Sequence, residues 1–164
     1  MMGRETTAVS ACTHNVSIGA LVVVEAPDKL RTVLGSCVGI ALYDRRRRLA
    51  GLAHVILPEG NSESAELGKF ADQAVDNLIV QLAAMGASKT RLQAKLVGGA
   101  AMFGAENNNG LGDRNVEVAR ERLGQHGIPI LAEAVGGTQG RKLFVDPDSG
   151  EAIVESIGQK REVI

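Results

Sequence analysis

Two residues of this chain have the types and spacing for nucleophilic chemistry: Cys37, within the segment LGSCV (34–38), and His54, seventeen positions later. A thiol becomes a strong nucleophile when a neighbouring group removes its proton, and an imidazole is a common base for this step. The pair therefore predicts a cysteine hydrolase or transferase. The structural alternative stays open, because a lone cysteine near an apolar strand is more often a packed small hydrophobe.

A single β-hairpin is the element that we expect to bring the two residues together. Residues 37–43 and 50–57 are apolar runs of strand length, and a charged run separates them. With the turn at residues 44–47, Cys37 lies directly opposite His54. Opposed side chains on one face of a hairpin have Cβ atoms about 4.5–5.5 Å apart, which permits a contact between the sulfur and the imidazole.

The residues before and after the first strand also carry predictions. Gly35 and Ser36 precede the candidate nucleophile, where glycine permits a close backbone approach and free N–H groups can bind an oxyanion. The arginine run at residues 45–48 is expected to be a solvated hairpin tip. The functional alternative for this run is a docking point for an acidic partner helix.

Composition excludes several classes of function. The chain has 164 residues, a formal net charge of −1 and 2% aromatic residues. This length favours one domain with a real core, the charge provides no field that attracts nucleic acid or an anionic membrane, and stacking platforms for single-stranded nucleic acid are missing. Two cysteines do not make a disulfide framework, which favours a reducing, cytoplasmic setting. The Cys and His residues lack paired ligand spacing, so we expect no metal site.

The rest of the chain alternates between strand and helix patterns. We expect residues 1–17 to be a loosely ordered N-terminal segment and residues 18–164 to form a single domain. Helices are predicted at 68–85 and at 113–125, the second with Asp113 as its N-cap. Because the late strands favour antiparallel pairing, the predicted fold class is layered α+β. The predicted strands are residues 18–24, 37–43, 50–57, 92–97, 128–135, 142–145 and 152–157.

Several segments together resemble the chemoreceptor glutamine deamidase family, CheD. The resemblance covers roughly residues 18–157, in the family's order. It is specific because the interval from cysteine to histidine and the glycine pairs fall where that family has them. The segments are TVLGSCV (32–38), AHVILP (53–58), AKLVGGA (94–100), LGDRNV (111–116) and the glycines from Gly136-Gly137 to Gly140-Arg141.

This resemblance implies a cytoplasmic hydrolase, a protein-glutamine glutaminase that tunes chemotactic adaptation. Its substrates would be glutamines of methyl-accepting chemotaxis receptors, converted to glutamate through a thioester with release of ammonia and without a cofactor. The implied fold is a layered α/β sandwich with mixed, largely antiparallel sheets and two main helices, related to the catalytic domains of bacterial deamidating toxins. Carried over onto this chain, Cys37 is the nucleophile, His54 the base, and Thr32 the hydroxyl that orients the imidazole. Under an ungapped alignment the neighbouring Arg31 takes the place of Thr32.

A second hypothesis belongs to a different class. Members of this family are thought to pair with a CheC-type phosphatase, so the chain would be a regulatory binding module with catalysis secondary. The state of the thiol separates the two hypotheses, because a lowered pKa of Cys37 favours catalysis and ordinary thiol behaviour favours the module.

Overall fold

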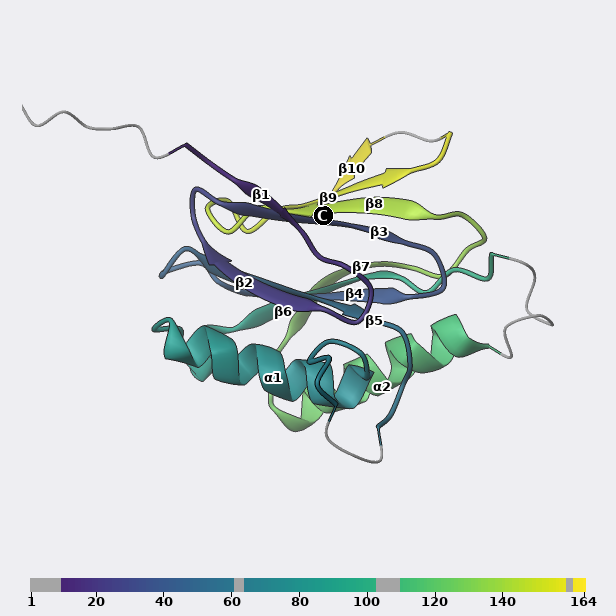
Figure 1. Cartoon of the computed structure of the whole chain (residues 1–164), viewed down its shortest axis with the longest axis horizontal. Helices are drawn as coiled ribbons and strands as arrows, with labels where there is room; N and C mark the ends of the chain where they lie inside the picture. Colours follow the sequence, from purple (N-terminus) through teal and green to yellow (C-terminus); the bar gives the residue numbers. More distant parts are fainter. Residues whose placement is uncertain (1–9, 61–63, 103–109, 159–160) are drawn as a thin grey trace, which may run out of the picture.

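The computed structural model of the chain describes residues 10–60, 64–102, 110–158 and 161–164 (Figure 1). Two five-stranded β-sheets lie one upon the other, and two α-helices cover the outer face of one of them (Figure 1). Each layer buries an apolar face against the next. The predicted α+β fold with layered sheets and two main helices is confirmed.

The two sheets are mixed and largely antiparallel, as expected. The strands are β1 (Thr13–Asn15), β2 (Leu21–Glu25), β3 (Lys29–Leu34), β4 (Val38–Asp44), β5 (Leu49–Val55), β6 (Gln93–Gly98), β7 (Ile130–Val135), β8 (Arg141–Val145), β9 (Ala152–Ser156) and β10 (Arg161–Val163). The first sheet has the order β1-β3-β8-β9-β10, and the second has the order β2-β5-β4-β6-β7. Within the described residues, only β1 with β3 and β6 with β7 pair in parallel. Three of the strands, β1, β3 and β10, lie outside the predicted set.

Strand β4 shows why its sequence is one continuous apolar run. All seven of its residues are buried, because the strand is covered on both faces. Val38, Ile40 and Leu42 face the helices, whereas Ala41 and Tyr43 face the first sheet. This alternation is the two-residue period of a β-strand. Two hydrophobic cores result, one beneath the helices and one between the sheets.

The helices α1 (Ala71–Ala84) and α2 (Leu111–Gln125) pack their apolar stripes on the second sheet. Gly86, with φ of +105°, lies directly after the C-cap of the first helix, where glycine adopts this backbone conformation without strain. Asp113 is not the N-cap that we predicted: Gly110 holds that position, and Asp113 lies in the first turn, where its charge favours the helix N-terminus. Neither helix in the described part of the chain is long and apolar enough to cross a lipid bilayer.

Regular structure begins before residue 18. Residues 1–9 of the segment predicted to be loosely ordered lie outside the described residues, but β1 pairs with β3, and Val16 is only 1% exposed. Burial of Val16 between the sheets and a hydrogen bond from His14 to Asp28 hold this segment in place. The part of this segment that the structure describes therefore includes a paired strand.

The β4–β5 hairpin has a different register from the predicted one. Residues 45–48 form the turn, and Gly39 lies opposite His54. The prediction that Cys37 lies directly opposite His54 is therefore wrong. The turn keeps four residues, so the shift moves the pairing by an even step and the alternation of faces is preserved.

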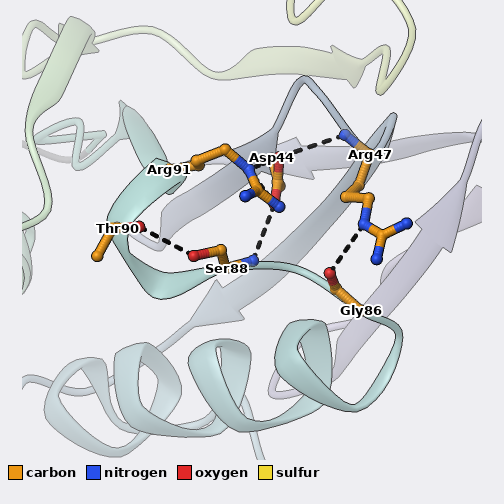
Figure 2. Close-up of polar contacts among 6 residues, drawn as sticks. All are labelled: Asp44, Arg47, Gly86, Ser88, Thr90 and Arg91. Atoms are coloured by element: carbon orange, nitrogen blue, oxygen red, sulfur yellow. Dashed lines mark hydrogen bonds and ion pairs between the residues drawn. The ribbon is translucent and has the colours of Figure 1, made fainter.

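Asp44 is the physical reason for the shift. Its side chain is fully buried, and Asp44 pairs with Leu49 as the last residue of β4. The carboxylate accepts hydrogen bonds from the backbone N–H groups of Ser88 and Arg47, at 2.9 and 3.3 Å, and from the Arg91 guanidinium at 2.9 Å (Figure 2). Burial acts to raise the pKa of Asp44, but these hydrogen bonds hold it below its ordinary value. Asp44, which we expected in a solvated turn, is thus a buried residue of the sheet.

Candidate active site

Cys37 lies in the short link that carries the chain from the first sheet to the second, between β3 and β4. Gly35 and Ser36 belong to the same link, and all three residues are partly exposed. The Cys37 side chain packs in part against the core between the sheets. Cys37 therefore lies at one end of the sandwich, partly buried and partly exposed to solvent.

The glycines at the end of β6 hold this link through backbone hydrogen bonds. The N–H of Gly99 donates to the Cys37 carbonyl at 2.9 Å, and the N–H of Ala100 donates to the Gly35 carbonyl at 3.0 Å. Gly98 has φ of +106°, and a Cβ at this position would collide with the Cys37 carbonyl oxygen. This close backbone approach fixes the backbone that carries the thiol.

His54 and Thr32 meet between the two sheets. Thr32 belongs to β3 of the first sheet and His54 to β5 of the second, and each is 2% exposed. The Thr32 Oγ1 atom lies 2.7 Å from His54 Nδ1 and 2.7 Å from the carbonyl oxygen of Val16. Arg31 is exposed, and its guanidinium lies over the Phe144 ring. The hydroxyl at the imidazole is therefore that of Thr32.

These two contacts decide which nitrogen of His54 carries the hydrogen. A hydroxyl has one hydrogen, and a carbonyl oxygen can only accept, so Thr32 donates to Val16. The Thr32 oxygen must then accept from His54 Nδ1. The neutral imidazole consequently keeps its lone pair on Nε2, which is the arrangement that a general base needs.

Burial favours the uncharged forms of both candidate catalytic groups. It raises the pKa of the Cys37 thiol, and it lowers the pKa of His54, where the Val16 carbonyl acts in the opposite direction. Among the described residues the Cys37 sulfur has no hydrogen-bond partner. Both shifts favour a neutral thiol and a neutral imidazole in the free protein over a preformed ion pair.

Backbone donors are also available in the link. Across the described residues, the N–H groups of Ser36 and Cys37 make no backbone hydrogen bond, whereas the carbonyls on either side of Ser36 are occupied. Two such donors next to a nucleophile can bind an oxygen that gains negative charge. The part of the chain that the structure describes contains no cluster of three or more His, Cys, Asp or Glu side chains that could hold a metal ion.

Two features of this site escaped the sequence patterns. The Val16 carbonyl is a backbone group, and no residue type signals it. Asn115, near the start of α2, ties this helix to the residue after β5, because its Nδ2 donates to the Ile56 carbonyl at 2.9 Å. The sequence pattern did not indicate this partner next to the site.

Comparisons with known proteins agree with the motifs. Residues 56–156 match the family described as CheD chemotactic sensory transduction. The chain is 39% identical over 155 residues to the probable chemoreceptor glutamine deamidase CheD of Lachnoclostridium phytofermentans, covering 91% of this chain and 96% of that protein. It is 40% identical over 156 residues to the chemoreceptor glutamine deamidase CheD of Halalkalibacterium halodurans, with the same two coverages of 91% and 96%. Among solved structures, the hypothetical protein YfiH of Bacillus licheniformis has a TM-score of 0.46 and 17% identity over 75% of this chain and 58% of that one.

Proposed function

Since this chain belongs to the CheD family, we propose that it deamidates glutamine side chains of chemoreceptors, converting them to glutamate. The observation that carries the mechanism is the contact of 2.7 Å between Thr32 Oγ1 and His54 Nδ1, which orients a buried imidazole at the end of the sandwich where Cys37 lies. We also propose that the reaction takes place in the cytoplasm.

In the first half of the proposed reaction, the Cys37 sulfur attacks the carbon of the glutamine carboxamide. Because the thiol is neutral in the free protein, its proton passes to His54 Nε2 as the carbon–sulfur bond forms, and substrate binding brings the groups into reach. The free N–H groups of Ser36 and Cys37 bind the oxyanion. His54 then donates its proton to the nitrogen, the carbon–nitrogen bond breaks, and ammonia leaves a thioester behind.

In the second half, water hydrolyses the thioester. His54 takes a proton from the water molecule while the oxygen attacks the thioester carbon, and the same proton returns to the sulfur as the carbon–sulfur bond breaks. The products are glutamate and the original thiol. Thr32 stays hydrogen-bonded through both halves, so the ring returns to the tautomer with its lone pair on Nε2.

The raised pKa of Cys37 does not by itself choose between catalysis and the regulatory module that binds a CheC-type phosphatase. A lowered value was the expected mark of an active cysteine, but a thiol that is deprotonated only with substrate present also serves as a nucleophile. The activity of variants therefore has to separate the two hypotheses.

The experiment measures conversion of glutamine to glutamate in a purified receptor signalling domain by mass spectrometry. We expect Cys37→Ala to abolish conversion and Cys12→Ala, which removes the exposed second cysteine, to leave it unchanged. Thermal denaturation checks that both variants stay folded. Undiminished conversion by Cys37→Ala contradicts the mechanism, and absence of conversion by the unmodified chain favours the regulatory module.

A further inference from the structure

Three arginines converge at the tip of the β4–β5 hairpin, at the end of β4 away from Cys37. Arg46, Arg47 and Arg91 line a hollow of about 330 Å³; we call these three residues and their hollow the arginine pocket. A neighbouring hollow of about 410 Å³ shares Arg46 and Arg91. The two hollows together form a concave, positively charged surface.

Two of the three guanidinium groups are held in place by the protein. Arg91 donates from Nε to both carboxylate oxygens of Asp44, at 3.2 Å each, and from Nη2 at 2.9 Å (Figure 2). Arg47 donates from Nε to the Gly86 carbonyl at 3.2 Å (Figure 2). Within the described residues, Nη1 of Arg91 and both Nη atoms of Arg47 have no acceptor. These groups are therefore positioned donors with unused hydrogens.

Asp44 forms an ion pair with Arg91, but no carboxylate among the described residues forms one with Arg46 or Arg47. Arg46 is exposed and has no hydrogen-bond or ion-pair partner among the described residues. Asp44, which lines the neighbouring hollow, is fully buried and already accepts from Arg91 and two backbone N–H groups. Guanidinium groups held close together repel one another, and an anion bound between them relieves this repulsion.

We propose that the arginine pocket is a binding site for a phosphate group. Guanidinium is planar and donates two parallel hydrogen bonds, which matches phosphate oxygens, and several such groups can share one multiply charged anion. A hollow between converging side chains fits a compact group better than it fits the extended side of a helix. This site is separate from the candidate active site, because the seven residues of β4 span about 20 Å at 3.3 Å per residue.

Isothermal titration calorimetry of the full chain with sodium pyrophosphate, at low ionic strength, tests the proposal. We expect saturable binding that Arg46→Gln weakens at least tenfold, since a hydrogen bond to a charged partner is lost. Arg161→Gln, which removes an exposed arginine of β10, is the matched control and should bind as the unmodified chain does. Because Arg46 has no partner within the described structure, its replacement should leave the melting temperature unchanged.

A second arm identifies the source of the phosphate. Cosedimentation with phosphatidylcholine vesicles that contain phosphatidic acid shows whether a lipid headgroup reaches the same pocket. Binding of either probe that Arg46→Gln weakens and Arg161→Gln does not supports the site. Equal binding by the two variants, or no saturable binding of either probe, overturns it.

Discussion

Replacing Thr32 by valine tests the tautomer assignment directly. Valine has nearly the shape of threonine, so the substitution removes the hydroxyl and little else. It leaves the Val16 carbonyl and the Nδ1–H of His54 buried without their partner. Thr32 and His54 are both 2% exposed, so water does not replace the hydroxyl without rearrangement.

The expected cost follows from these two groups. A buried polar group that loses its hydrogen bond costs about 1–3 kcal/mol, so the two groups together should lower the free energy of unfolding of Thr32→Val by about 2–6 kcal/mol. For a domain of this size each kcal/mol lowers the melting temperature by about 2–4 °C. Thr32→Ser keeps the hydroxyl and should lose less than half as much stability.

Glutamine conversion should depend on the hydroxyl of residue 32 and not on its methyl group. General base catalysis contributes about 10²- to 10⁴-fold, and an imidazole that no longer keeps its lone pair on Nε2 loses part of this. We expect glutamine conversion to fall about 10- to 100-fold in Thr32→Val, consistent with the loss of this contribution, and to stay close to that of the unmodified chain in Thr32→Ser. The nitrogen chemical shifts of His54 in ¹⁵N nuclear magnetic resonance report the tautomer independently of turnover.

Two outcomes would refute the reasoning. One is a Thr32→Val variant that keeps full activity with the hydrogen still on Nδ1. The other is a Thr32→Ser variant as impaired as Thr32→Val, because the methyl group would then matter and the hydroxyl would not.

Two further predictions concern the backbone and pH. Gly98→Ala should lower the free energy of unfolding by about 1–3 kcal/mol and displace the link at Cys37, which should also lower activity. Gly110→Ala, at a positive φ in open space, should lower it by only about 1 kcal/mol. Similar losses of stability and activity in the two variants, measured by denaturant unfolding and by glutamine conversion, would contradict this prediction. Burial lowers the pKa of His54, so the unfolded chain binds a proton first and stability should fall as pH drops from 6.5 toward the folded-state value. Denaturant titrations at several pH values in this range should show that the free energy of unfolding depends less steeply on pH in His54→Gln than in the unmodified chain. The same pH dependence in both proteins would count against a neutral buried imidazole.

The sequence was sufficient for the layered fold class because most elements bury apolar residues at regular spacing. The missed strand β3 is instructive. Leu30, Thr32 and Leu34 alternate inward, but the polar residue in the middle interrupts the apolar pattern. Thr32 is inward because it bonds to Val16 and His54, and those partners come from other elements. Hydrophobic periodicity alone cannot show such a residue.

The register of the β4–β5 hairpin could not be predicted from the sequence for a related reason. Local charge assigned Asp44 to the turn, whereas its burial depends on Arg91 and Ser88, more than forty positions away. Long-range polar contacts of this kind leave no local signal. The predicted pairing of Cys37 with His54 was therefore wrong, although an even shift in register preserves the face to which each side chain points.

The hydrogen bond between Thr32 and His54 makes the proposed chemistry sensitive to how the two sheets are aligned. Each sheet supplies one partner, so sliding one sheet past the other by a fraction of a residue would free the imidazole while both hydrophobic cores stayed intact. Hydrostatic pressure or gentle warming should therefore inactivate the protein before it unfolds, and loss of turnover would be an early measure of slippage between the layers.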